Sequence, residues 1–335
     1  QVADVEVVAP YDDAAEVSRF VEGCDVVTFE FENVPAEVAH LAELAGVPAR
    51  PSGRVLATCQ DRAAEKTFLA SVGVPTVRFA HAPQGAGDLS RAVRAVGHPA
   101  VVKTAAFGYD GKGQWRVERP EDLPTVAADV GSQPLVVEEL VELALEVSII
   151  VSRSVTGETS TYPVVENRHR DHILDVSAFP ARVEERTATT ATGYAARVAE
   201  ALDLVGVLAV ECFLTSDGRL LVNELAPRPH NSGHLTIEAC PTSQFEQQLR
   251  AVCGLPLGAT GPARPAAMAN LLGEAWAGGE PDWASVLAEA GVALHLYGKG
   301  EPRPGRKLGH LTAVAGTVED AVARVERARR LACRG

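Results

Sequence analysis

The sequence predicts an α/β fold in its first part and an α+β arrangement in the remainder, and three observations lead to this assignment. Strand-like apolar stretches alternate with helical patterns over residues 1–60, which is typical of a parallel α/β unit. Strands then dominate residues 146–225, around one long helical pattern. From about residue 262 strands and helices mix again. We therefore expect three parts, at 1–60, 61–260 and 261–335.

The expected strands are short, apolar and rich in β-branched residues, whereas the expected helices repeat apolar residues every three to four positions. The strands are expected at 5–9, 24–29, 47–50, 100–103, 114–117, 134–139, 267–272, 292–297 and 308–315. The helices are expected at 12–22, 35–45, 62–71, 88–96, after Pro120, and at 187–202, 282–290 and 318–331.

Composition narrows the class of protein. The formal net charge of -13 argues against a general nucleic-acid binder, although a local basic cluster would still suit a small anionic ligand. The six cysteines are widely spaced without a CxxC pair, which is typical of reduced, buried thiols. No apolar run is long enough to span a membrane, and the first residues lack a signal-peptide pattern. A cytoplasmic enzyme is expected.

Two glutamates are predicted to face each other in a hairpin. Segment 207–226 has two apolar strands around Asp217-Gly218, a strong two-residue turn signal. If residue 216 pairs with 219, Glu211 lies opposite Glu224 on one face. Carboxylates facing each other at roughly 5 Å need a compensating cation, and Mg²⁺ held together with nucleotide phosphates would supply it. The alternatives are a glutamate beyond the sheet end or paired with arginine, and a proton-sharing catalytic dyad.

A glycine-rich segment lies between two strand-like stretches at 100–117. It lacks Ser or Thr after Lys112 and does not open a helix, so it is a flap and not a P-loop. Backbone N–H groups of such a flap can bind phosphate oxygens, and Lys103 would place its ammonium beside them. A plain turn is the alternative, but the carboxylate pair favours the nucleotide interpretation.

Two further segments carry polar side chains suited to anions. Segment 223–234, N-E-L-A-P-R-P-H-N-S-G-H, follows the second facing glutamate and offers hydrogen-bond donors on a backbone stiffened by prolines. Segment 297–310 is basic within an acidic protein and suits a phosphate monoester. A solvated surface loop is the alternative for each. His169 and His172 lack a third metal ligand nearby, so we prefer a nucleotide or structural role for His169.

In their order along the chain, four segments resemble the N5-carboxyaminoimidazole ribonucleotide synthetase family of the ATP-grasp superfamily. They are F-G-Y-D-G-K-G-Q-W, A-V-E-C-F, N-E-L-A-P-R-P-H-N-S-G-H and R-P-G-R-K-L-G-H-L. The resemblance covers nearly the whole chain. It implies an ATP-grasp fold with a truncated N-terminal parallel α/β subdomain, a lid subdomain at about 77–138 and a small C-terminal subdomain.

The resemblance also implies roles for individual residues. ATP would be bound by Arg62, Lys103, Gly108, Tyr109, Asp110, Gly111, Lys112, Gly113, Gln114, Glu138, Glu139, Leu140, Val141, Glu146, His169, Asn223 and Glu224. Magnesium would be bound by Glu211 and Glu224. The ribonucleotide would contact Glu32, Tyr109, Asp110, Arg228, Asn231 and Ser232, and its phosphate would contact Lys299, Arg306 and Lys307. The expected catalytic residues are Lys103, Arg228 and His230.

The implied reaction begins when bicarbonate attacks the γ-phosphate of ATP to give carboxyphosphate and ADP. Carbon dioxide from carboxyphosphate then carboxylates the exocyclic amine of aminoimidazole ribonucleotide. The implied partners are these small molecules and a second copy in a homodimer, with no nucleic acid and no membrane. The family opens with a G-x-G-Q-L-G-R-M type loop, and none precedes Val5, so we expect the first βα unit to be missing. The alternatives are another ATP-grasp ligase, such as formate-dependent glycinamide ribonucleotide transformylase, or a non-catalytic ATP-binding protein.

Overall fold

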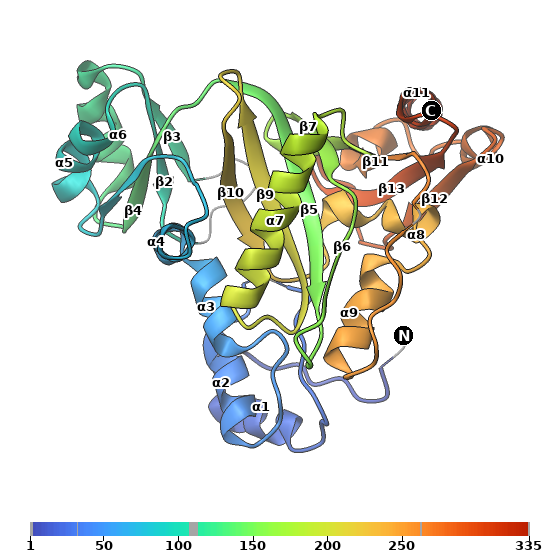
Figure 1. Ribbon diagram of the computed structural model, residues 1–335, viewed down its shortest axis with the longest axis horizontal. Coiled ribbons are helices and arrows are strands. Elements are labelled where there is room, and N and C mark those ends of the chain that lie inside the picture. Colours follow the sequence, from blue (N-terminus) through green and yellow to red (C-terminus); the bar gives the residue numbers. More distant parts are fainter. Residues whose placement is uncertain (1–2, 32, 107–112, 262, 334–335) are drawn as a thin grey trace.

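The computed structural model describes residues 3–31, 33–106, 113–261 and 263–333. Three groups of elements follow one another along the chain (Figure 1). The N-terminal helices lie below a large central sheet, a small sheet lies to its left, and the C-terminal elements lie to its right. None of the helices in the described ranges is long and apolar enough to cross a membrane.

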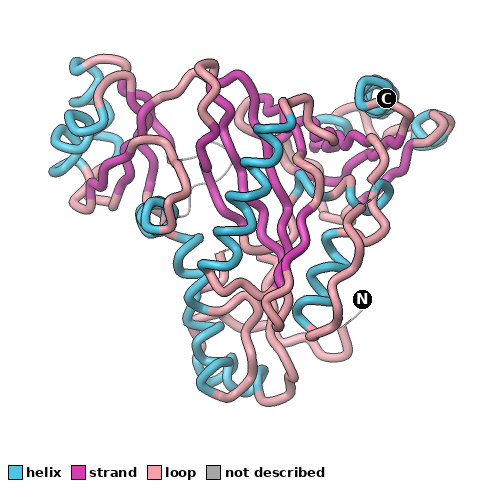
Figure 2. Tube along the Cα trace, in the orientation of Figure 1, coloured by secondary structure: helices cyan, strands magenta, loops and turns pink. Residues whose placement is uncertain are grey.

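The N-terminal part is mostly helix and loop (Figure 2). Its helices are α1 (Ala14–Val21), α2 (Ala36–Leu44) and α3 (Gly53–Gln60). Val27 and Ala49 form a single parallel bridge between the segments that connect them. The expected parallel α/β unit is therefore present as helices with a minimal sheet contact.

All three strands expected in this part are wrong. Residues 5–9 form no strand, and the side chains of Val5 and Val8 are 74% and 91% exposed. Of residues 24–29 only Val27 joins a bridge, and of residues 47–50 only Ala49 does, because a strand requires a hydrogen-bonded neighbour along its length. Helix α3 was missed, although Ser52 caps it by accepting a hydrogen bond from the amide of Val55.

The small sheet is antiparallel and has the strand order β1-β4-β2-β3. Its elements are β1 (Phe79–Ala82), α5 (Ala86–Val96), β2 (Ala100–Thr104), β3 (Gln114–Val117), η1 (Pro120–Asp122), α6 (Leu123–Val130) and β4 (Leu135–Glu139). Val102 and Val137 pack in one core with α5 and α6, which cover one face. Because side chains alternate along a strand, Lys103 and Glu138 lie on the opposite face.

The large sheet has the strand order β10-β9-β5-β7-β8-β11-β13-β12, with β6 paired to β5. The strands are β5 (Leu143–Arg153), β6 (Thr159–Thr161), β7 (Val165–Arg170), β8 (Ile173–Phe179), β9 (Gly206–Thr215), β10 (Leu220–Ala226), β11 (Ala266–Leu272), β12 (Val292–Leu296) and β13 (Lys307–Val314). The strands of the C-terminal part thus continue the sheet that carries the two glutamates.

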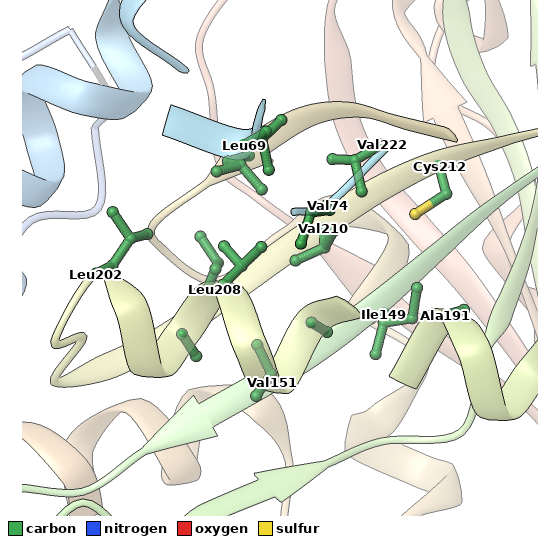
Figure 3. Packing of buried hydrophobic residues seen from close by; sticks show 14 of the residues in the cluster. Leu69, Val74, Ile149, Val151, Ala191, Leu202, Leu208, Val210, Cys212 and Val222 are labelled. Atoms are coloured by element: carbon green, nitrogen blue, oxygen red, sulfur yellow. The ribbon is translucent and has the colours of Figure 1, made fainter. Parts of the chain in front are cut away.

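Helix α7 (Glu185–Ala201) packs on one face of β5 and β9, where Ile149, Leu208 and Val210 lie in a common apolar core (Figure 3). Full burial of each such side chain contributes about 1.5–3 kcal/mol. Helix α11 (Val318–Ala332) covers the C-terminal strands, and α4 (Arg62–Ser71) contacts both β4 and β10. The other helices are η2 (Asn231–Gly233), α8 (Thr236–Ala239), α9 (Gln244–Val252), η3 (Gly273–Trp276) and α10 (Trp283–Leu287).

The cysteines differ in burial. Four are buried or half-buried, but Cys253 and Cys333 are exposed. Each of these two follows the last turn of a surface helix, α9 and α11 respectively. The prediction that the cysteines are buried is therefore wrong for these two.

The hairpin of β9 and β10 differs from its predicted form in two ways that compensate. The turn has three residues, 216–218, because the amide of Thr215 donates to the carbonyl of Arg219 at 2.9 Å and Leu214 pairs with Leu220. Gly218 has φ +84°, as a three-residue turn of this kind requires. The predicted pairing of 216 with 219 is therefore wrong. A β-bulge at residue 223 then restores the register.

Candidate active site

Glu211 and Glu224 are opposite each other, as the sequence predicted. Cys212 of β9 and Val222 and Leu225 of β10 all pack in the core under α7. Val222 and Leu225 reach the same face although they are three positions apart, because the bulge inserts one residue between them. Glu211 and Glu224 therefore both lie on the face away from α7.

The carboxylate of Glu211 is held by His230, whose Nε2 lies 2.9 Å from Glu211 Oε1. His230 Nδ1 is in turn 2.9 Å from the Ser232 hydroxyl. Burial alone would raise the pKa of Glu211, but the charge and hydrogen bond of His230 lower it to about 2, with smaller contributions from His169 and Lys307. Glu211 is therefore ionised at neutral pH.

Buried polar side chains continue the same face of the sheet away from Glu211. The Ser148 hydroxyl donates to the Ser232 hydroxyl at 2.8 Å and accepts from the Asn167 amide at 2.9 Å, and the Ser177 hydroxyl donates to Asn167 Oδ1 at 2.7 Å. Sequence analysis missed Ser148, Asn167 and Ser177. The available signal was a serine at an inward-facing position of an apolar strand, V-S-I-I.

Glu146 and His169, both predicted to bind nucleotide, form an ion pair on the adjacent strands β5 and β7. His169 Nδ1 lies 2.9 Å from Glu146 Oε2. Burial disfavours the imidazolium, but this carboxylate outweighs it and raises the pKa of His169. Glu146 is opposite Phe213 of β9, so the pair lies one strand away from Glu211.

The small sheet contributes a buried ion-pair network. Lys103 Nζ lies 2.6 Å from Glu138 Oε2, and Lys66 Nζ lies 3.1 Å from Glu138 Oε1. Burial alone would raise the pKa of Glu138, but Lys103 and Lys66 lower it to about 2. The Glu138 side chain therefore fixes Lys103. Lys66 was not predicted, and its signal was a charge on the inner side of an amphipathic helix.

Arg62 connects the two sheets at the first turn of α4. Its Nη1 donates to the Thr104 carbonyl of β2 at 3.3 Å, and its Nη2 lies 4.0 Å from Glu224 Oε2 of β10. Its side chain is only 13% exposed. A cation thus lies near the second facing carboxylate, as one alternative interpretation of the sequence allowed, but at the edge of ion-pair distance.

The remaining residues predicted to bind nucleotide lie at the end of β4, in the connection from β4 to β5, and in the flap before β3. Glu139 contacts Arg78 at 3.5 Å and Arg219 at 3.6 Å. Leu140 and Val141 are half-buried where the chain passes from β4 to β5. Gly113 and Gln114 form the end of the flap, and Gln114 pairs with Lys103. Glu32, Gly108, Tyr109, Asp110, Gly111 and Lys112 lie outside the described residues.

Segment 223–234 packs against the C-terminal strands. Asn231 and Asn270 exchange two amide hydrogen bonds of 3.0 and 2.7 Å. The Tyr297 hydroxyl lies 3.1 Å from His234 Nδ1 and 2.8 Å from His310 Nδ1. Arg228 Nη1 donates to the Pro229 carbonyl at 3.1 Å.

The three predicted phosphate cations occupy different environments. Lys307 lies near enough to the glutamate pair for its charge to lower the pKa of Glu211. Lys299 and Arg306 are exposed, with Lys299 Nζ 5.2 Å from the Tyr297 ring centroid. The Arg306 guanidinium donates to the Glu301 carbonyl at 3.1 Å. The fold thus brings one cation to the carboxylates and leaves two at the loop surface.

The protein groups alone do not form a complete metal-binding site. Within the described ranges, no three His, Cys, Asp or Glu side chains are grouped so that they could hold an ion. Two facing carboxylates, one of them with a depressed pKa, instead suit a hard divalent cation that takes its other ligands from phosphate oxygens and water.

Comparison with protein families matches the chain in three segments. Residues 1–60 match the ribonucleotide synthetase preATP-grasp domain, and residues 67–245 match the ATP-grasp domain. Residues 266–324 match the phosphoribosylaminoimidazole carboxylase C-terminal domain.

Individual proteins give the same result. The chain is 45% identical over 313 residues to the N5-carboxyaminoimidazole ribonucleotide synthase of Bacillus subtilis, which covers 93% of this chain and 81% of that protein. A crystal structure of an N5-carboxyaminoimidazole ribonucleotide synthetase with ADP has a TM-score of 0.91 at 40% identity, covering 98% of this chain and 85% of that one. The Aspergillus clavatus synthase with ADP and 5-aminoimidazole ribonucleotide has a TM-score of 0.88 at 30% identity, covering 100% and 88%.

Proposed function

The chain belongs to the N5-carboxyaminoimidazole ribonucleotide synthase family, and we propose that it carboxylates 5-aminoimidazole ribonucleotide with ATP and bicarbonate in de novo purine biosynthesis. It is an ATP-dependent carbon–nitrogen ligase with an ATP-grasp fold. The observation that carries this function is the pairing of Glu211 with Glu224 beside the cations Arg62 and Lys307. Such a site suits phosphoryl transfer, which is catalysed mainly by positioning and by charge neutralisation.

ATP is proposed to lie between the two sheets. Lys103 and Arg62 would contact its phosphates, because both extend from the junction of the small and large sheets. The Glu146–His169 pair and segment 138–141 would contact the ribose and the base. The full set taken from the family is Arg62, Lys103, residues 108–114, residues 138–141, Glu146, His169, Asn223 and Glu224.

Mg²⁺ is proposed to be bound by Glu211 and Glu224. The two carboxylates fit such an ion, since they lie opposite each other and Glu211 stays ionised at neutral pH. With few protein ligands, an ion here would keep positions for phosphate oxygens, as Mg²⁺ usually does at nucleotide sites. When bound, it would neutralise charge on the transferred phosphoryl group.

The proposed reaction has two steps. A bicarbonate oxygen attacks the γ-phosphorus of ATP, the bond to the bridging oxygen breaks, and ADP leaves. Carboxyphosphate then splits into phosphate and carbon dioxide, which forms a bond with the exocyclic amine as that amine loses a proton. Lys103 would stabilise the charge on the transferred group, and Arg228 and His230 would border the intermediate.

The ribonucleotide is proposed to lie beside segment 223–234. Its contacts would be Glu32, Tyr109, Asp110, Arg228, Asn231 and Ser232, and its phosphate would meet Lys299, Arg306 and Lys307. The support for the last group is the concentration of cations in segment 297–310 of an acidic chain, with Lys307 near Glu211. A homodimer is also proposed, and sedimentation equilibrium would test it.

The test of this function is phosphate release from ATP. We expect release to require Mg²⁺ and to rise when both aminoimidazole ribonucleotide and bicarbonate are present. The carboxylated product would be identified by incorporation of labelled bicarbonate. Stimulation by formate and glycinamide ribonucleotide in their place would overturn the substrate assignment.

A further inference from the structure

Two consecutive residues of α4, Glu65 and Lys66, are ionisable and almost fully buried. Each of the two residues is only 1% exposed. Neither belongs to the set proposed to touch substrate. Burying ionisable groups is costly unless they are paired or hydrogen-bonded, so their contacts show what the burial achieves.

The contacts hold both peptide groups that flank Glu224. Lys66 Nζ donates to the Asn223 carbonyl at 3.3 Å, which belongs to the peptide before Glu224. The Glu65 carboxylate accepts from the Leu225 amide at 2.8 Å, which belongs to the peptide after it. Because these two peptide planes set φ and ψ of the residue between them, α4 fixes the backbone of Glu224 at the bulge.

The same bulge is held from a third point. The Thr76 hydroxyl donates to the Val222 carbonyl at 2.8 Å and accepts from Lys66 at 3.3 Å. A bulge interrupts the regular ladder and leaves backbone groups without cross-strand partners. The Lys66 ammonium supplies a partner for the Asn223 carbonyl there.

Lys66 also contacts the small sheet. Its ammonium lies 3.1 Å from Glu138, and Glu138 in turn holds Lys103 at 2.6 Å. One buried cation therefore contacts both the strand that carries Glu224 and the carboxylate that fixes Lys103. The two groups belong to different sheets, so no hydrogen-bonded ladder sets their separation.

We propose that Lys66 is a positioning residue that sets Glu224 on the large sheet and Lys103 on the small sheet in one fixed arrangement, so that a metal–nucleotide complex is recognised as a unit. The residue does not touch substrate. This inference rests on the proposed function, because it presupposes that Glu224 faces the metal and Lys103 the phosphates.

The test compares nucleotide binding with and without metal by calorimetry, using the non-hydrolysable analogue β,γ-imido-ATP. The quantity measured is the ratio of the Kd without Mg²⁺ to the Kd with Mg²⁺. In Lys66→Met we expect this ratio to fall by about 10- to 100-fold, the range found when outer-shell partners of a metal ligand are removed. Loss of a nearby positive charge alone would strengthen metal binding and raise the ratio. A fall in the ratio therefore shows that Lys66 positions Glu224 and Lys103.

Arg153→Met is the matched control. Like Lys66, Arg153 donates a hydrogen bond to a backbone carbonyl, that of Leu204, at 2.9 Å. Arg153 lies at the end of β5 that is away from Glu211, where it pairs with Gly206 of β9. Its ratio should equal that of the unmodified protein. If Lys66→Met does not fold, Thr76→Val removes the hydroxyl shared by Lys66 and β10 with little change of volume, and a smaller fall is expected.

The outcomes separate the two proposals. If the unmodified protein itself shows no gain in affinity with Mg²⁺, the proposed metal site is wrong. If it shows the gain and the variants retain it in full or exceed it, the positioning role of Lys66 is overturned. A lower fraction of folded protein would change the binding stoichiometry and leave the ratio unchanged.

Discussion

Glu211 and Glu224 are opposite each other because, in this chain, a bulge at Asn223 offsets the extra residue of the turn that joins their strands. Together they form a pair of acidic groups on the face of the sheet that is not covered by α7. The following predictions test the roles that this arrangement implies.

Glu224→Gln should lower kcat by at least about 100-fold while the fold is retained, because a neutral amide cannot replace an ionised metal ligand. Phosphate release in the presence of both substrates measures the loss, and circular dichroism checks the fold. Glu158→Gln, at an exposed position between β5 and β6, is the control and should be unchanged. Full turnover in Glu224→Gln would show that the metal assignment is wrong.

His230→Gln should move the acid limb of magnesium-dependent nucleotide binding to higher pH. His230 keeps the pKa of Glu211 low against the effect of burial, so without its charge Glu211 takes up a proton at a higher pH. Calorimetric titrations over a series of pH values measure this. His40→Gln removes a surface pair with Glu43 (3.2 Å) and should leave the limb in place. Identical limbs for His230→Gln and the unmodified protein would contradict the coupling.

Glu138→Gln should lower the free energy of unfolding by about 3–5 kcal/mol, because it leaves the buried Lys66 and the half-buried Lys103 without this counter-charge. Urea denaturation near neutral pH measures this. The pKa of Glu138 in the folded protein is about 2, below its ordinary value of 4.5. Its stabilisation is therefore present above about pH 4.5 and is lost as the pH falls towards 2, and the variant should lack this dependence.

The control for this experiment is Glu166→Gln. Glu166 pairs with Arg182, which is 48% exposed and can return to water when the pair is broken. A smaller loss is expected there. Equal losses at the two positions would mean that the burial of Lys66 and Lys103 does not matter.

Glu65→Gln should stabilise the protein relative to the unmodified chain increasingly as the pH rises. Burial and the nearby Glu224 raise the pKa of Glu65 well above its ordinary value of 4.5. An acid with a raised pKa favours folding below its unfolded pKa and loses that contribution as the pH rises through the folded value. Glutamine has no such loss and keeps an oxygen for the Leu225 amide. Urea denaturation at about pH 5 and about pH 8 compares the two, and parallel curves would contradict the prediction.

Arg306→Met should raise KM for the ribonucleotide by about tenfold or more and leave KM for ATP unchanged, since a hydrogen bond to a charged group contributes about 1.5–3 kcal/mol. Steady-state kinetics with each substrate varied in turn measure this. Arg330→Met, at an exposed position of α11, is the control. An equal rise for both substrates would place Arg306 outside the phosphate site.

Much of the fold was predictable from local patterns. Helix α4 and strand β3 begin and end where periodicity placed them, and β9 and β10 are apolar strands around a glycine turn. The prediction failed for residues 5–9, because an apolar pattern cannot show whether a hydrogen-bonded neighbour exists. It also missed the bulge, because Asn223 looks like any other residue of a strand.

The site was predictable where chemistry is unusual for its surroundings. Two glutamates within apolar strands and a lysine near the end of β2 are of this kind, and α4 contacts both β10 of the large sheet and β4 of the small sheet. The roles of Glu65 and Lys66 could not be predicted, because both are ordinary residues for a helix. Their burial depends on three segments far apart in the sequence: α4, β4 and β10.

The bulge also bears on how related sequences are aligned. A homologous hairpin that lacked the residue equivalent to Asn223 would have an unbroken ladder, and its two acids would still be neighbours. A gap of one position at this point therefore indicates a change in the contact between α4 and β10. The residues equivalent to Glu211 and Glu224 remain equivalent.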